Sequence, residues 1–206
     1  MQIFEELSED KQLRIINAGM EVFGKYDYKH ANTELIASKA GISKGLLFYY
    51  FKNKQSFYLY LFQYCEKIVF RIIDKTEIMK IDDFYELLSY GAEKKLDILH
   101  QYPYIMDFIL KAWLASQHGE IEGLTKQMNQ IMDSTYTTWF SHINLAKFKD
   151  DVDPKRICQM MIWMMQGYLY ELQLSRREID IEVLMAEFRE WSTMFKRFTY
   201  KDEYQS

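Results

Sequence analysis

The sequence predicts an all-α protein, and three observations support this prediction. The 206 residues include 8 glycines and 2 prolines, so residues that break helices are few. Alternation of apolar and polar residues, the pattern of a half-buried strand, is hard to find anywhere in the chain. Apolar residues recur instead at spacings of three and four, as on one face of a helix. With 49% hydrophobic and 27% charged residues, the composition is that of a soluble globular protein.

The first expected helix begins after Ser8, whose hydroxyl can cap it while Glu9 and Asp10 meet the positive end of its dipole. Its apolar face consists of Leu13, Ile16, Met20 and Phe23. We expect this helix to end near Lys25. Residues 26–32 are aromatic and polar without a helical period, and we expect a loop there.

Residues 33–51 predict two short helices joined by a tight turn at Gly41. Thr33 is expected to cap the first of these helices and Ser43 the second. The small side chain of Ala37 lets the two helices approach closely. This is the pattern of a helix-turn-helix, which packs its apolar side on the helix before it.

The rest of the chain predicts six further helices. They are expected over residues 54–74, 83–101, 104–116, 121–139, 154–174 and 181–198. Asn53 is expected to cap the first of them, and Asp153 followed by Pro154 is a favoured helix start. Because no linker rich in Gly, Pro or Ser separates the parts, we expect a head, residues 1–53, coupled directly to a helical body, residues 54–206.

The charge is unevenly distributed along the chain. Residues 25–54 hold six lysines against Asp27 and Glu34, a balance of 6 − 2 = +4 within a chain of net charge −4. The remainder therefore sums to −8. A small basic head on an acidic body fits local contact with phosphates better than indiscriminate coating of nucleic acid.

Several classes of protein and site are excluded. The acidic N-terminus does not fit an export signal, residues 160–165 are too short an apolar run to cross a bilayer, and we expect a cytoplasmic protein. Cys65 and Cys158 lie far apart in the sequence, so we expect buried thiols and no disulfide. The four histidines lack the spacing of metal ligands, and we expect neither a metal nor a cofactor.

One motif of an enzyme is present by coincidence. Gly41-Ile-Ser-Lys-Gly45 matches G-x-S-x-G, the nucleophile elbow of α/β-hydrolases. That elbow requires a strand before the serine, whereas the residues before Ser43 are helical in pattern. We therefore expect Ser43 to be a helix cap and the protein not to be an enzyme.

The head resembles the DNA-binding part of TetR-family bacterial transcriptional regulators. The matching residues are Thr33, Ile36-Ala37, Ala40-Gly41-Ile42-Ser43-Lys44-Gly45, Tyr50-Phe51 and Lys54, with Phe23 near the end of the preceding helix. The resemblance covers about residues 8–62, and beyond it the all-helical layout and the length agree. It implies an N-terminal three-helix domain with a helix-turn-helix, followed by a helical domain for ligand binding and dimerisation.

In that family the second helix of the motif enters the major groove of DNA. The resemblance therefore implies that Lys44 and Gly45 meet phosphates or base edges, and that Phe48 and Tyr49 face the groove. The implied DNA-binding residues are Thr33, Ser43, Lys44, Gly45, Leu46, Phe48, Tyr49, Tyr50 and Lys54. Leu46 and Phe48 replace the threonine and tyrosine that the family often has there, which favours contact with thymine methyl groups.

The body is rich in side chains that suit an apolar cavity. Residues 54–206 hold all four tryptophans and 12 − 2 = 10 of the methionines. Core packing alone accounts for any one of these residues, whereas the resemblance implies an effector pocket for a small hydrophobic or aromatic molecule. The expected ligand-binding residues are Tyr64, Ile68, Leu88, Phe108, Trp113, Met132, Trp139, Trp163 and Tyr170.

The last two expected helices are too apolar for the surface of a monomer. In the family they usually pair with the same helices of a second copy, which implies a homodimer. The expected dimerisation residues are Met161, Met165, Tyr168, Leu184, Phe188, Trp191 and Phe195. The chain is thus interpreted as a repressor that binds a palindromic operator and is released by a small effector. The alternative is a DNA-bound structural or protein-recruiting factor without an effector.

Overall fold

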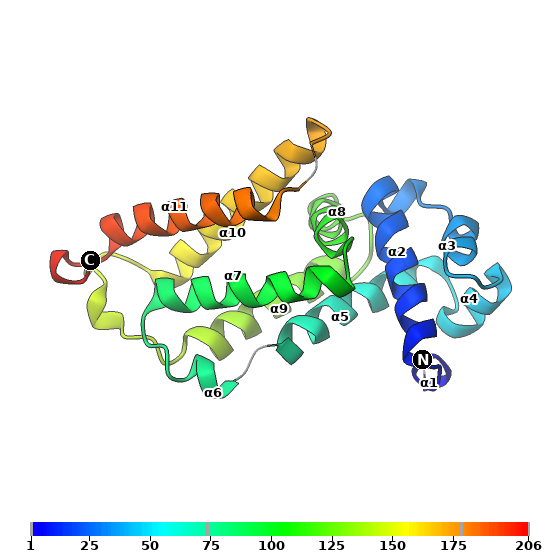
Figure 1. Ribbon diagram of the computed structural model, residues 1–206, viewed down its shortest axis with the longest axis horizontal. Coiled ribbons are helices and arrows are strands. Elements are labelled where there is room, and N and C mark those ends of the chain that lie inside the picture. Colours follow the sequence, from blue (N-terminus) through cyan, green and yellow to red (C-terminus); the bar gives the residue numbers. More distant parts are fainter. Residues whose placement is uncertain (1, 73–74, 178, 206) are drawn as a thin grey trace. The chain divides into compact units, whose positions relative to one another are not determined.

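The computed structural model describes residues 2–72, 75–177 and 179–205. Within them the chain forms helices, together with an isolated antiparallel bridge between Phe148 and Tyr200 (Figure 1). The α-helices are α1 (Gln2–Glu5), α2 (Glu9–His30), α3 (Thr33–Lys39), α4 (Lys44–Phe51), α5 (Lys54–Ile72), α6 (Lys75–Ile78), α7 (Phe84–Gln101), α8 (Ile105–Gln117), α9 (Leu124–Phe140), α10 (Pro154–Leu174) and α11 (Ile181–Thr199). Two short 3₁₀ helices are η1 (Leu145–Lys147) and η2 (Asp202–Tyr204). The all-α prediction is confirmed.

The chain packs as two compact units. The first unit contains Met1–Ile72 and Asp97–Met132, and the second contains Ile73–Leu96 and Asp133–Ser206. The helices α7 and α9 each contribute residues to both units. The expected boundary between residues 53 and 54 separates the parts of the chain by function, whereas these two units are defined by packing. That boundary stays a prediction.

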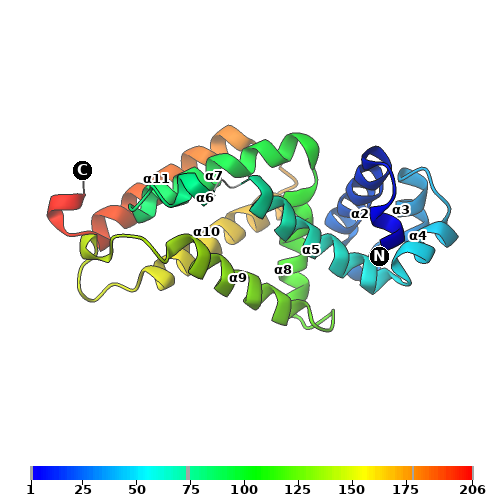
Figure 2. The same ribbon diagram turned by 90° about the horizontal axis from the view of Figure 1, so that it is seen from below.

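The first unit is built around α2. This helix packs against α3, α5 and α8, and Figure 2 shows α2 grouped with α3 and α4. Two glycines allow the close approach: a Cβ at Gly19 would lie 2.7 Å from side-chain atoms of Leu61 and Phe57 on α5. A Cβ at Gly24 would lie 2.9 Å from Cβ of Asp107 on α8. The helix-turn-helix therefore rests on a helix that has no room to shift on its other sides.

Two features of the N-terminal region differ from the sequence-based expectation. The loop expected at residues 26–32 is wrong, because α2 continues to His30 across an irregular position at Asp27, where φ is 60° and ψ is 178°. The Asp27 carboxylate accepts a hydrogen bond from the backbone N–H of His30 at 3.0 Å and contacts its ring Nδ1 at 3.0 Å. This local cap restarts the helical turn after the kink. The short helix α1 was not expected, and it buries Phe4 against Phe51, with ring centroids 4.8 Å apart.

Three of the expected helix caps are present, whereas Ser8 precedes α2 without a cap hydrogen bond from its side chain. Ser43 accepts a hydrogen bond from the backbone N–H of Leu46 at 3.1 Å, and Asn53 accepts one from Ser56 at 2.8 Å. Asp153 caps α10 with proline in its first turn. The cap of α3 is Asn32, one residue before the expected Thr33. The shorter Asx turn places the Asn32 side chain 2.8 Å from the backbone N–H of Glu34.

The second unit is built from α6, most of α7, the end of α9, α10 and α11. The helices α10 and α11 pack side by side (Figure 1). On α7, a Cβ at Gly91 would lie 2.6 Å from the indole ring of Trp139, so this glycine makes room for the tryptophan. The C-terminus is tied to α7, because the hydroxyl of the fully buried Tyr200 accepts a hydrogen bond from the backbone N–H of Phe84 at 3.1 Å.

Candidate nucleic-acid interface

The helix α4 has one buried side and one uncovered side. Leu47 and Phe51 are almost fully buried in the core of the first unit, and so is Tyr50, with 6% of its surface exposed. On the opposite side Lys44 is exposed, and Tyr49 exposes 63% of its surface. The turn before α4 is fixed by Gly41, whose φ of 68° lies in the region that glycine favours. The chain therefore anchors α4 through its core side and presents the other side to solvent.

The start of α4 is arranged like an anion site. The Ser43 hydroxyl is used by the cap, and the first backbone bond of the helix runs from the N–H of Leu47 to the carbonyl of Ser43 at 3.1 Å. The N–H groups of Lys44 and Gly45 precede that bond, at the positive end of the helix dipole. Gly45 is exposed, and the nearest atom to a Cβ placed on it is the Ser43 hydroxyl oxygen at 3.9 Å. A phosphate thus has steric access to this helix end.

Lys44 is held by a carboxylate of the neighbouring helix. Its ammonium Nζ lies 2.9 Å from Oε1 of Glu34, which stands in the first turn of α3. The hydrogen bond from Lys44, together with its positive charge, lowers the pKa of the Glu34 carboxyl. Both side chains remain in contact with solvent, with 47% of Lys44 and 67% of Glu34 exposed.

The other predicted DNA contacts have different surroundings. Leu46 and Phe48 are half-buried on α4, and Thr33 is half-buried at the first residue of α3. Lys54 donates a hydrogen bond to the backbone carbonyl of Lys29 at 3.2 Å, and its ammonium lies 5.0 Å from the centroid of the Tyr28 ring. Partial burial lowers the pKa of Lys54. These contacts show Lys54 tying the start of α5 to the end of α2.

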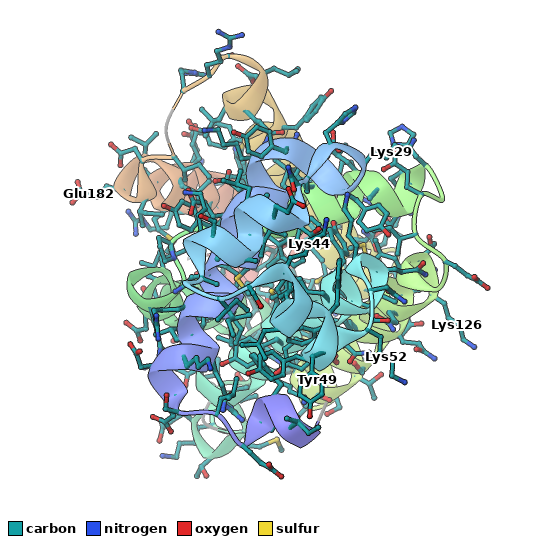
Figure 3. The ribbon with its side chains drawn as sticks, turned by 90° about the vertical axis from the view of Figure 1, so that its right-hand side faces the viewer. Lys29, Lys44, Tyr49, Lys52, Lys126 and Glu182 are labelled. Atoms are coloured by element: carbon teal, nitrogen blue, oxygen red, sulfur yellow. The ribbon has the colours of Figure 1, made fainter. Side chains whose placement is uncertain are left out.

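One exposed cation of this face was not predicted. Lys52 caps the C-terminal end of α4 with a φ of 64°, and its backbone N–H donates to the carbonyl of Phe48 at 2.7 Å. Figure 3 shows Lys44, Tyr49 and Lys52 on the side of the molecule where the helix-turn-helix faces the viewer. The sequence signal is the run Lys52-Asn53-Lys54, which by itself indicates only the break between two helices.

Comparisons with known proteins agree with this geometry. The family model for bacterial regulatory proteins of the tetR family matches residues 15–61, which include α3 and α4. The fatty acid metabolism regulator protein of Bacillus subtilis (strain 168) is 29% identical over an alignment of 163 residues, and the alignment covers 63% of this chain and 83% of that protein. The chain thus carries the DNA-binding helix-turn-helix of tetR-family regulators. It is therefore a transcription regulator.

Solved structures of TetR-family proteins share the fold. The fatty acid degradation regulator FadR from Bacillus halodurans matches with a TM-score of 0.66 at 18% identity, over 87% of this chain and 96% of that chain. The transcriptional regulator FadR from Bacillus subtilis, solved in complex with stearoyl-CoA, matches with a TM-score of 0.55 at 20% identity, over the same shares of the two chains.

The ligand-binding residues predicted for this chain are divided between its two compact units. Tyr64, Ile68, Phe108 and Trp113 belong to the first unit, and Leu88, Trp139, Trp163 and Tyr170 belong to the second. Phe108 is fully buried, and the Tyr64 hydroxyl lies 3.0 Å from that of Tyr102. Trp163 and Tyr170 expose 46% and 39% of their surfaces. The side chain of Met132 lies outside the described residues.

Two hollows on the surface of the second unit, both open to solvent, involve other residues. One, of about 450 Å³, lies between the start of α7 and the second half of α11, and includes Glu86 and Arg189. The other, of about 390 Å³, lies around η1 and the loop that leads to α10. Neither is lined by a predicted ligand-binding residue, so that set stays a prediction.

The predicted dimerisation residues all belong to the second unit, where each is buried or half-buried. Met161 and Leu184 expose 4% and 5% of their surfaces. Tyr168 and Trp191 pack edge to face, with ring centroids 5.8 Å apart. Met165, Phe188 and Phe195 are half-buried. The exposed large apolar side chains of α10 are instead Met160, Trp163, Tyr170 and Leu174.

Two kinds of feature are absent from the described part of the chain. None of its helices combines the length and the apolar character needed to cross a bilayer. Nowhere in residues 2–72, 75–177 and 179–205 do three side chains of His, Cys, Asp or Glu gather as metal ligands.

Proposed function

We propose that this regulator is a repressor that binds a palindromic operator as a homodimer and leaves it when a small, mainly hydrophobic effector binds. The observation that carries the DNA-binding mode is the uncovered side of α4. Lys44 and Tyr49 are exposed there while Leu47 and Phe51 fix the helix in the core. Residues 1–53 would read DNA, and residues 54–206 would bind the effector and a second copy.

On DNA, the two ends of α4 have different tasks from its middle. Lys44, Gly45 and Lys52 meet phosphates, which sets the position of the helix in the major groove. Tyr49 and the half-buried Leu46 and Phe48 lie between those ends and contact base edges. Apolar contacts of this kind favour the methyl group of thymine.

Dimerisation is supported by the apolar surface of α10 and α11. On α10, Met160, Trp163, Tyr170 and Leu174 follow one another at spacings of three, seven and four, so they share one helical face. On α11, Val183, Met194 and Phe198 are exposed, and Phe198 exposes 71% of its surface. Exposed apolar side chains of this kind suit a self-complementary interface about a two-fold axis. Such a dimer would present two copies of α4 to successive major grooves.

For the effector, we propose a long-chain fatty acyl thioester of coenzyme A. The relative from Bacillus subtilis is a fatty acid metabolism regulator, and a regulator of the same fold was solved with stearoyl-CoA. The body of this chain supplies adaptable methionines and large aromatic rings, which suit a long apolar chain. Both DNA and this thioester occur in the cytoplasm, where we place the protein.

The proposed release follows from differential affinity. The effector would bind best to a conformation of the body in which the two α4 helices stand at the wrong separation for successive grooves. Each copy would then keep its own fold, and the dimer would lose simultaneous contact with both half-sites.

The test begins with genomic footprinting of the bound sites, followed by fluorescence anisotropy on the operator found. Stearoyl-CoA should weaken operator binding by at least about tenfold, which corresponds to a coupling of about 1.4 kcal/mol. Free coenzyme A is the matched control and should have no such effect. Equal operator affinity with and without a panel of acyl thioesters would remove this effector. It would favour a DNA-bound factor that recruits other proteins.

A further inference from the structure

The basic character of the head is reduced by tertiary ion pairs. Three of the six lysines in residues 25–54 are paired: Lys29 with Glu120 at 2.9 Å, Lys39 with Glu21 at 2.8 Å, and Lys44 with Glu34 at 2.9 Å. Two of these partners, Glu21 and Glu120, lie outside that segment of the sequence. Counting them, the local balance falls from +4 to 6 − 4 = +2. Non-specific attraction to a polyanion is correspondingly weaker.

Of the three pairs, the one between Lys44 and Glu34 stands at the reading surface. Lys44 is the first residue of α4, and Glu34 is in the first turn of α3, so the pair joins the starts of both helices of the motif. The backbone at Glu34 is fixed, because its N–H donates to the side chain of the cap Asn32 at 2.8 Å. A carboxylate is therefore held 2.9 Å from the cation that stands at the start of α4.

The ion pair between Lys44 and Glu34 contributes too little to fold stability for that to be its role. Its two side chains are 47% and 67% exposed, and exposed ion pairs contribute little to the free energy of unfolding. DNA binding is far more sensitive to such a charge, because each lysine that neutralises a phosphate releases a counterion. The carboxylate of Glu34 competes with phosphates for the same ammonium group.

We propose that Glu34 is a specificity-determining residue that keeps Lys44 from contributing to non-specific DNA binding. This inference rests on the proposed placement of α4 in the major groove. In a loosely docked complex no phosphate is held in hydrogen-bonding position, so Lys44 stays with the carboxylate at 2.9 Å. On the operator, contacts from Tyr49 and its neighbours fix the register, and a phosphate is then placed where it displaces Glu34. The ion pair thus opens only on the correct sequence.

The test compares salt dependence on two duplexes, the footprinted operator and a scrambled duplex of the same composition. The full chain carrying Glu34→Gln should bind the scrambled duplex several-fold more tightly. Its log–log salt slope on that duplex should steepen by about 0.9, the value for one added phosphate contact. Operator affinity should change less, so the ratio of the two affinities falls. The melting temperature should stay close to that of the wild type.

Two further variants make the test specific. Glu21→Gln removes the same charge from the head and frees Lys39, and it should change the affinity ratio less than Glu34→Gln does. In a Lys44→Gln background, adding Glu34→Gln should have no further effect on the salt slope. Equal ratios for the two glutamate variants, or an undiminished effect in the Lys44→Gln background, would overturn the inference. If footprinting finds no site that the wild-type protein binds, both the proposed function and this inference are overturned.

Discussion

The uncovered sides of α4 and α10 differ in chemistry, and under the proposed function they meet two different partners. On α4 the exposed side chains are Lys44 and Tyr49, with Lys52 at the end of the helix. On α10 the exposed face includes Trp163, which exposes 46% of its surface, and Leu174, which exposes 66%. Both helices bury their other sides within their own unit. The difference lies in charge, since cations suit a polyanion whereas an apolar face suits a second copy of itself.

Introducing charge into the apolar face of α10 should have the largest effect. The double change Trp163→Asp and Leu174→Asp would place four carboxylates in the dimer interface, two from each copy. Such burial is unfavourable, so we expect a folded monomer in sedimentation. Operator affinity should fall by about 100-fold or more, because the two α4 helices no longer bind as a linked pair.

The matched control for this change is Met79→Asp, which alters a side chain that is 59% exposed and does not lie on α10. It should leave both the sedimentation and the operator affinity unchanged. A double variant that remains dimeric would show that α10 is not the interface.

Substitutions of two glycines compare a helix side that is covered by the same chain with a helix side that is open to solvent. Gly19 on α2 lies against Phe57 and Leu61, so Gly19→Leu should lower the free energy of unfolding by about 1 to 3 kcal/mol through overpacking. A Cβ at Gly167 on α10 would meet no described atom within 4 Å beyond its own stretch of helix, so Gly167→Leu should not overpack the monomer and should raise its free energy of unfolding by about 0.5 to 1 kcal/mol through helix propensity. It should weaken the dimer, as measured by sedimentation. Chemical denaturation of both variants separates the two effects. Each series is run at a protein concentration at which the dimer is either fully formed or fully dissociated.

Substitutions of Lys44 on α4 and Lys54 on α5 test the predicted contacts with phosphates. Lys44→Ala should weaken binding to the operator and flatten the salt slope there by about 0.9, because one phosphate contact is lost, whereas binding to a scrambled duplex should change little because Glu34 holds Lys44 there. Lys54→Ala should also lower the melting temperature, because Lys54 donates to the carbonyl of Lys29. A Lys44→Ala protein with an unchanged salt slope would contradict its phosphate role.

Tyr49→Ala provides the contrasting control for the two lysines. Tyr49 exposes 63% of its surface in the middle of the helix, and its loss should alter the preferred sequence while leaving the salt slope in place.

The smallest expected effect concerns the titration of Glu34. The hydrogen bond and the charge of Lys44 lower its pKa, so the pair contributes stability above the pKa of an unfolded glutamate. That contribution is lost as the pH falls through the lowered pKa of the folded protein. Side-chain NMR should show the lowered pKa in the wild type, and a return toward the ordinary value in Lys44→Gln. An unaltered Glu34 titration in that variant would contradict the ion pair in solution.

Local signals in the sequence determined the helix-turn-helix. The turn at Gly41 and the cap at Ser43 depend on a few neighbouring residues, and the apolar spacing of α4 selects Leu47 and Phe51 as its core side. Such features are readable without knowledge of the rest of the chain. The kink at Asp27 was missed because its cap, a carboxylate bonded to His30, resembles the polar composition of a loop.

What only the tertiary structure decided is which groups from distant parts of the sequence meet. Periodicity places Trp163 and Met161 on the same apolar helix, but the packing of the second unit buries Met161 and leaves Trp163 exposed. The sequence likewise assigned six lysines to the head, whereas the fold brings Glu21 and Glu120 to two of them. Charge pairing depends on distances through space, and local sequence patterns do not contain those distances.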